Sequence, residues 1–212
     1  MLTFEDVKNN PTIRTYIQRA DESLIALGFT EHSFAHVTLV AETAGYILRT
    51  VELARIAGFL HDIGNLVNRV DHSQSGAVMA FRILDHLDCA PEEIAEIVTA
   101  IGNHDEGTGM PVNAVAAALI LADKSDVRRS RVRNQDPASF DIHDRVNYAV
   151  TDQTLKINTD KKVISLNLQI DTDICSMYEY FEIFLNRMLM CRGAADLLGA
   201  TFKLTANGAK VL

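Results

Sequence analysis

The chain has 212 residues, of which 48% are hydrophobic and 23% are charged, and its formal net charge is −8. This composition excludes a disordered tail, and the negative charge argues against general nucleic-acid binding. No apolar run approaches the ~20 residues that cross a bilayer, and the N-terminal MLTFEDVKNN lacks the basic then apolar order of a secretory signal. We therefore expect a cytoplasmic protein with no membrane partner.

Helical periodicity dominates the chain up to about residue 150. Apolar residues recur every three or four positions in four stretches, which are residues 36–60, 76–87, 91–102 and 112–127. Pro91 fits the first position of the third of these helices. We expect a mainly α protein with an all-helical domain over residues 1–145.

The pattern changes in the last third of the chain. Two alternating apolar runs joined by Asn-Thr-Asp-Lys predict a β-hairpin. The stretch 171–199 predicts one long helix, with Asp171 or Asp173 as its cap and Gly199 at its end, and one or two short strands should follow. Residues 146–212 are therefore expected to form a small α+β unit, which is a candidate surface for homodimerisation.

Histidines and aspartates follow a definite order along the helical half. An isolated histidine is more often solvated or hydrogen-bonded than a metal ligand, so the order carries the information. The members of this series are His36, the pair His61-Asp62, His72, His104 and Asp123. The series resembles the signature of the HD-domain metal-dependent phosphohydrolases over about residues 20–135. The segments DHSQSGA and GNHDEGTGMP resemble those of members that bind two metals, among them the HD-GYP phosphodiesterases and bacterial HD-type diadenosine tetraphosphate hydrolases.

This resemblance implies an all-α domain with a binuclear metal centre. The implied ligands of one ion are His36, His61, Asp62 and Asp123, and those of the second are Asp62, His72 and His104. It further implies hydrolysis of a phosphoester or phosphoanhydride, with a small nucleotide-like substrate, a metal-bridging hydroxide and Asp62 as the catalytic carboxylate.

The ligand types support this interpretation on their own. Imidazole and carboxylate suit manganese or iron, and also zinc, cobalt or nickel, and the lack of a nearby cysteine excludes a thiolate site. A carboxylate such as Asp62 can span two ions ~3.5–4 Å apart, the separation used for displacement at phosphorus.

A locally basic segment follows Asp123 on its expected helix. Lys124, Arg128 and Arg131 are candidate phosphate-binding residues there, and Arg69 is a fourth. The alternative is a solvated helix end at which the cations offset the helix dipole.

Three further features have plainer interpretations. The second pair, His143-Asp144, lies after the domain and is expected to belong to a helix start with Asp141, and not to bind metal. His32 is expected in a supporting or surface role. Gly64 is expected to release the preceding His-Asp pair from helical geometry.

Two other functions stay open at this point. Asn65 replaces the lysine of the HD-x-G-K motif, and Asn103-His104 stands where HD-GYP proteins have two adjacent histidines. A non-catalytic regulatory or ligand-sensing module that keeps the metal site is therefore an alternative. A di-iron HD oxygenase is another.

Overall fold

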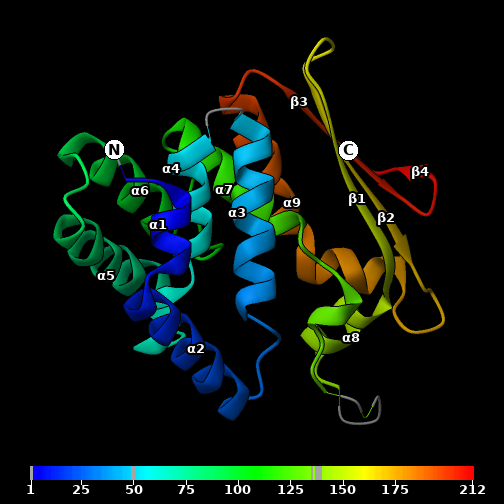
Figure 1. Cartoon of the computed structure of the whole chain (residues 1–212). Helices are drawn as coiled ribbons and strands as arrows, with labels where there is room; N and C mark the ends of the chain where they lie inside the picture. Colours follow the sequence, from blue (N-terminus) through cyan, green and yellow to red (C-terminus); the bar gives the residue numbers. More distant parts are fainter. Residues whose placement is uncertain (1, 49–50, 135, 137–139) are drawn as a thin grey trace.

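The computed structural model describes residues 2–48, 51–134, 136 and 140–212. Helices form the first two thirds of the chain, and a small sheet with one long helix forms the last third (Figure 1). The first seven helices are α1 (Phe4–Asn9), α2 (Pro11–Ala26), α3 (Phe34–Leu48), α4 (Val51–Leu60), α5 (His72–His86), α6 (Pro91–Gly102) and α7 (Ala114–Ser125). They are followed by α8 (Ile142–Ala149) and α9 (Met177–Leu197), and two 3-10 turns are η1 (Ile63–Leu66) and η2 (Arg129–Arg131). The mainly α prediction with a C-terminal α+β unit is confirmed.

Local sequence explains several of the helix starts. Pro91 is the first residue of α6, as expected, and Asn113 caps α7 by accepting a hydrogen bond from the backbone N–H of Ala116. The stretch 36–60 was expected to be a single helix, and this is wrong, because it contains α3 and α4. Residues 49 and 50 lie outside the described residues. Both α3 and α4 bury their apolar faces in the same core. The spacing of apolar residues therefore continues through both helices and does not show where α3 ends.

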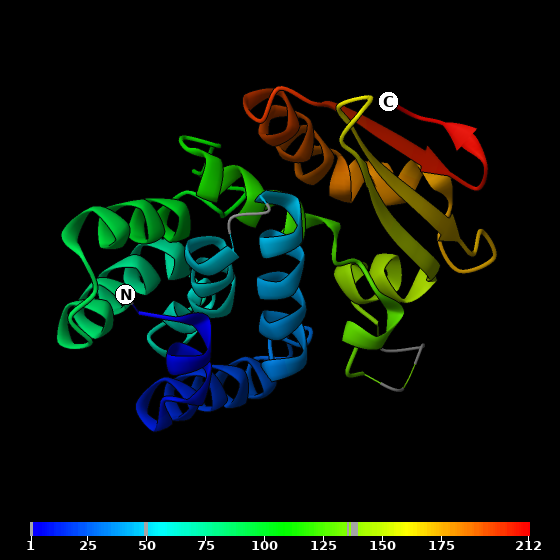
Figure 2. The same ribbon diagram turned by 45° about the horizontal axis from the view of Figure 1, so that its top comes forward.

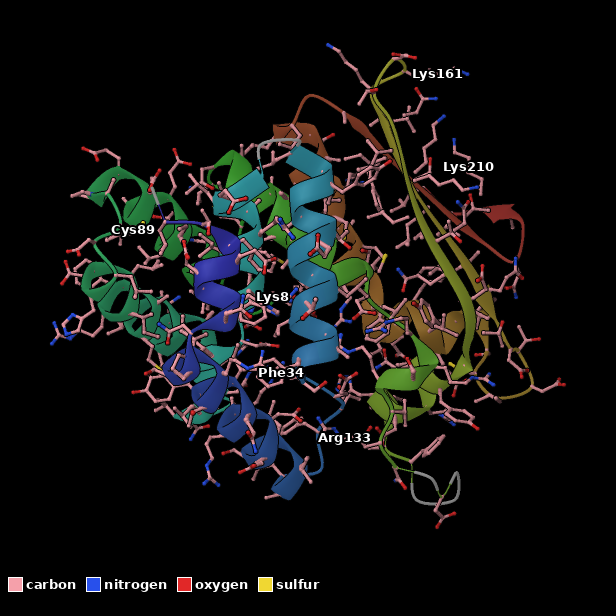
Figure 3. The ribbon with its side chains drawn as sticks, viewed as in Figure 1. Lys8, Phe34, Cys89, Arg133, Lys161 and Lys210 are labelled. Carbon is pink, nitrogen blue, oxygen red and sulfur yellow. The ribbon has the colours of Figure 1, made fainter. Side chains whose placement is uncertain are left out.

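The sheet has the strand order β1-β2-β3-β4, made of β1 (Val150–Asn158), β2 (Val163–Ile170), β3 (Thr201–Ala206) and β4 (Ala209–Lys210). The predicted hairpin is the antiparallel pair β1 and β2, and its turn carries Lys161 away from the helices (Figure 3). Strand β3 is parallel to β2, so α9 is the crossover connection between them. Helix α9 covers one face of the sheet (Figure 2), and Leu166 and Leu204, which are register partners, are buried there.

The start of α9 corrects one prediction. Neither Asp171 nor Asp173 is its cap, because Ser176 caps the helix and forms a reciprocal capping box with Glu179. Asp171 instead accepts a hydrogen bond from the backbone N–H of Asp173 in a turn before the helix. Gly199 follows the end of α9 with a φ of 69°, so the predicted stop is confirmed.

Helix α7 joins the two halves of the molecule. Residues 115–125 are all buried, and α7 contributes Leu119 to the core of the helical bundle and Ile120 to the core beneath the sheet. Val146 of α8 also belongs to the second core, and the division at residue 145 stays a prediction. None of the helices among the described residues combines the length and the apolar character that crossing a bilayer requires.

Candidate metal centre

The His-Asp pair lies in a tight turn between two helices. Helix α4 ends at Leu60, and His61 and Asp62 occupy the turn before η1. The pair lies outside the α-helix, as expected, and the release expected from Gly64, whose φ is not positive, stays a prediction. A Cβ atom at Gly64 would lie 1.9 Å from the carbonyl oxygen of His72, so glycine is needed for the close approach of η1 to the start of α5.

Asp62 lies at the centre of a group of buried histidines. Its Oδ2 is 3.2 Å from Nε2 of His61 and 3.7 Å from Nε2 of His36. Its Oδ1 is 3.4 Å from Nε2 of His72 and 4.0 Å from Nε2 of His104. Each carboxylate oxygen therefore faces its own pair of buried imidazoles, and Oδ2 also contacts the partly buried His32.

Asp123, in the last turn of α7, completes the first of these two groups. Its Oδ1 is 3.4 Å from Nε2 of His36 and 3.7 Å from Nε2 of His61. These spacings suit ligands of one ion, because donors about 2.0–2.2 Å from an ion lie roughly 3–4 Å apart. Within the described residues, Nε2 of His36 and Nε2 of His61 are buried without a hydrogen-bond partner. A bound cation would satisfy both atoms, so the residues fit a metal ion.

In all four histidines of these two groups, Nδ1 already has a hydrogen-bond partner, and this partner fixes the orientation of the ring. Each Nδ1 lies within hydrogen-bond distance of an acceptor. In protein metal sites, the ring nitrogen that does not bind the metal usually donates a hydrogen bond in the same way. The acceptors are Oδ2 of Asp126 for His36 (2.8 Å) and the carbonyl oxygens of Gly58, Arg69 and Ile101 for His61, His72 and His104 (2.8, 3.1 and 2.6 Å).

The pKa shifts of Asp62, Asp123 and His104 also suit cation binding, whereas the pKa of His61 is raised, because burial lowers it less than the neighbouring carboxylates raise it. Burial raises the pKa of Asp62, but the neighbouring His61 and His32 outweigh it and hold this pKa well below its usual range. Burial likewise raises the pKa of Asp123, but Lys124, His36 and His61 together outweigh it and hold this pKa well below its usual range. Burial, reinforced by His61, lowers the pKa of His104 well below its usual value. Charged carboxylates and neutral imidazole are the forms that bind metals.

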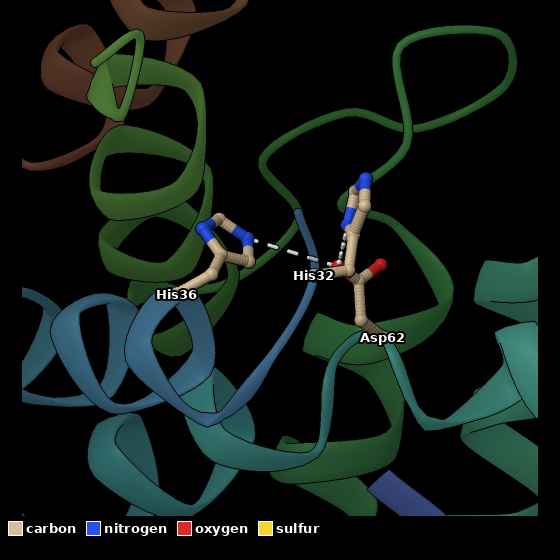
Figure 4. A group of neighbouring side chains, drawn as sticks. All are labelled: His32, His36 and Asp62. Atoms are coloured by element: carbon tan, nitrogen blue, oxygen red, sulfur yellow. Dashed lines mark hydrogen bonds and ion pairs between the residues drawn. The ribbon is translucent and has the colours of Figure 1, made fainter. Parts of the chain in front are cut away.

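His32 lies closer to the centre than the sequence indicated. Its Nδ1 contacts Oδ2 of Asp62, and its ring meets that of His36 edge to face with 5.4 Å between the ring centres (Figure 4). Ligand atoms of His32, His36 and Asp62 lie within 4.8 Å of one another. The surface alternative for His32 is therefore wrong, and the supporting role stays a prediction.

Asn65, which replaces the lysine of the family motif, holds Asp62 in place. Its Nδ2 donates hydrogen bonds to the backbone oxygen of Asp62 at 2.9 Å and to Oδ1 at 3.0 Å. Arg69 in turn donates from Nη1 to Oδ1 of Asn65 at 3.3 Å. The sequence marked Asn65 as a departure, and the structure gives it a positioning role.

A pocket of about 290 Å³ opens beside the cluster. Three of the four predicted cations, Arg69, Lys124 and Arg131, line it. Nζ of Lys124 lies 2.7 Å from Oδ2 of Asp123 and 3.4 Å from Oε1 of Glu106, so two carboxylates already hold this ammonium group.

Arg128 and Arg131 are both held by structural partners. Helix α7 ends at Ser125, so Arg128 and Arg131 do not continue it. Arg128 forms a two-pronged ion pair with Asp126 and does not line the pocket, so its predicted place beside the substrate is wrong. Arg131 does line the pocket, but it is buried and donates to the backbone oxygens of Glu31 and Asp126.

Helix α8 supplies another wall of the pocket. The expected helix start is confirmed, because Oδ1 of Asp141 accepts a hydrogen bond from the backbone N–H of Asp144 at 2.7 Å. Both residues line the pocket together with His143, although they follow the domain in the sequence.

Helix α9 contributes residues that the sequence did not reveal. Phe184 and Arg187 line the pocket, and Nε of Arg187 donates to Oε1 of Glu106 at 2.8 Å. The apolar spacing of this helix indicated core packing. That pattern does not show which helical turn of α9 lies beside the pocket.

Comparison with known proteins identifies the family. The HD domain model matches residues 29–135, and the chain therefore belongs to the HD-domain family. The chain is also similar to Uncharacterized protein MJ1020 of Methanocaldococcus jannaschii, with 22% identity. The match covers 62% of this chain and 62% of the relative, so the chain spans less than two thirds of that protein's length.

Proposed function

We propose that the protein is a metal-dependent phosphohydrolase that cleaves a phosphoester or phosphoanhydride bond in a small, nucleotide-like substrate. The observation that carries this proposal is the arrangement around Asp62, whose two oxygens each face a separate pair of buried imidazoles. A carboxylate so placed can bridge two ions. Membership of the HD-domain family supports the same conclusion.

The ions would be held by the side chains of the cluster. The proposed ligands are His36, His61, Asp62 and Asp123 for the first ion and Asp62, His72 and His104 for the second. Manganese or iron suits this set best, and zinc, cobalt or nickel would also fit. When bound, such ions supply Lewis acidity, which lowers the pKa of water and neutralises phosphate oxygens.

The charges of the pocket support two ions and not one. Of the residues that the structure describes, six carboxylates and four lysine or arginine side chains line it, so these side chains alone present an excess of negative charge to a phosphate. The excess amounts to two negative charges, six minus four, so one divalent ion would only cancel it. Two would leave a positive pocket that matches the dianion of a phosphomonoester and attracts it.

The protein groups around the ions would then orient the substrate. Asn65 keeps Asp62 in one rotamer through two hydrogen bonds. Arg69, whose Nη1 lies 3.9 Å from Oδ1 of Asp62, is placed to donate to a phosphate oxygen beside the second ion. Phosphoryl transfer depends on this kind of positioning and charge stabilisation.

The test is hydrolysis of a panel of chromogenic phosphoesters and nucleotides by the manganese-loaded protein. Asp62→Ala should lose both ions and all turnover. His86→Ala is the control, because His86 is an exposed histidine at the far end of α5, and it should behave like the parent.

Two results would overturn the proposal. A parent protein that binds two ions but hydrolyses none of the panel would indicate the regulatory or ligand-sensing alternative. Oxygen consumption and a change in the optical spectrum of the iron-loaded protein, without hydrolysis, would indicate the oxygenase.

A further inference from the structure

Helix α9 brings a cation to the pocket from outside the matched HD domain. Arg187 lies well beyond residues 29–135, yet it lines the same pocket as Asp62 and Asp123. Its guanidinium stacks on Phe184, with 4.4 Å between the charge centre and the ring centre. Its side chain is 18% exposed, so it is largely enclosed but still reaches the pocket.

Glu106 holds this guanidinium in a defined position. Oε1 of Glu106 accepts from Nε of Arg187 at 2.8 Å and lies 3.4 Å from Nζ of Lys124. One carboxylate therefore places two cations side by side beside Asp123. The contact with the Phe184 ring and the hydrogen bond from Nε to Glu106 both restrain the guanidinium, which lowers the entropy lost when it binds a ligand.

Arg187 keeps hydrogen-bonding capacity that its neighbours lack. The contact with Glu106 uses only the Nε–H, and a guanidinium carries five N–H donors. Among the described residues its Nη groups have no hydrogen-bond acceptor, and neither is fully enclosed by the protein, while Arg187 is one of the residues that line the pocket. Lys124, by contrast, is shared by two carboxylates, and Arg131 donates to backbone oxygens.

We propose that Arg187 binds the phosphate oxygens of the substrate through its Nη groups, and that the C-terminal α+β unit thereby completes the active site. This inference rests on the proposed phosphohydrolase function. The two Nη groups match the spacing of two phosphate oxygens, whereas an ammonium group acts as a point charge. Glu106 acts as a positioning residue for this contact.

The test measures binding of inorganic phosphate to the manganese-loaded protein by calorimetry, together with KM and kcat for the best ester of the panel. Arg187→Ala should weaken phosphate binding about 10- to 100-fold, the scale for losing a charge-assisted hydrogen bond. Arg187→Lys should recover part of this loss, because it keeps the charge without the paired donors. Added guanidinium chloride should partly restore phosphate binding to Arg187→Ala.

Arg192→Ala is the matched control, since Arg192 is exposed on the same helix. It should keep the phosphate affinity of the parent, and every variant should keep the metal content of the parent. If Arg187 only fastens α9 to Glu106, Arg187→Ala will lower the melting temperature and leave phosphate affinity and KM unchanged, which would overturn the inference.

The two proposals can fail separately. If the parent hydrolyses esters and Arg187→Ala retains full phosphate affinity, only the role of Arg187 is wrong. If the parent binds phosphate through Arg187 but hydrolyses nothing, the anion site stands and the phosphohydrolase proposal falls.

Discussion

Replacing Gly64 with alanine should separate the His-Asp turn from helix α5. The new Cβ would lie 1.9 Å from the carbonyl oxygen of His72 and 2.5 Å from the backbone nitrogen of Gly76. Ordinary carbon contacts begin near 3.5 Å, so η1 and α5 must move apart by roughly 1.5 Å. Neither obstructing atom can rotate away, because both belong to the backbone.

The expected cost is about 3 kcal/mol, the upper part of the usual range for overpacking. For a chain of this length, that corresponds to a fall of roughly 10 °C in melting temperature. The displacement would also carry the imidazole of His72 away from Oδ1 of Asp62, which now lies 3.4 Å from it. We therefore expect Gly64→Ala to lose the second ion and keep much of the first.

Gly193→Ala is the control for this substitution. A Cβ atom there would lie 3.8 Å from Cγ of Pro111, which is an ordinary contact. Because alanine is about 1 kcal/mol more favourable than glycine inside a helix, this variant should be slightly more stable than the parent. Thermal unfolding with chelator present and elemental analysis without it provide both measurements. A Gly64→Ala protein as stable and as rich in metal as the parent would refute the reasoning.

Other substitutions probe different parts of the site. His143→Ala should leave metal content and turnover nearly unchanged, and loss of metal would show that the wrong His-Asp pair was chosen. Asp141→Ala should cost ~1 kcal/mol in the free energy of unfolding, because it removes the cap of α8, and an unchanged denaturation midpoint would contradict this. Asp126→Ala should weaken metal affinity about 10- to 100-fold, since Asp126 orients His36; chelator competition would detect this loss, and its absence would argue against that role.

The cluster of histidines and aspartates was largely predictable because each proposed ligand lies at or near a helix end. His61 follows α4, His72 begins α5, and His104 follows α6 by two residues. Residues that are far apart in the chain are therefore brought together at one end of the helical bundle. The reason for Gly64 was not predictable, because the carbonyl oxygen that excludes a side chain there belongs to the next helix.

The placement of the cations around the pocket could not be predicted in the same way. The basic segment after Asp123 suggested a continuing helix, but α7 ends at Ser125 and Arg128 turns to Asp126. Arg187 and Glu106 are 81 positions apart and meet only because α9 packs on α7. Helical spacing shows that a helix has an apolar face, and it does not show which of its polar residues will lie beside a distant site.

The metal content of His72→Ala, measured with turnover on the same preparations, tests the central claim most directly. The parent and the control His86→Ala should each bind two ions per chain, whereas His72→Ala should bind one and hydrolyse its substrate ~100-fold more slowly, because the charge stabilisation from the second ion is lost. Two ions or full turnover in His72→Ala would contradict a binuclear centre bridged by Asp62.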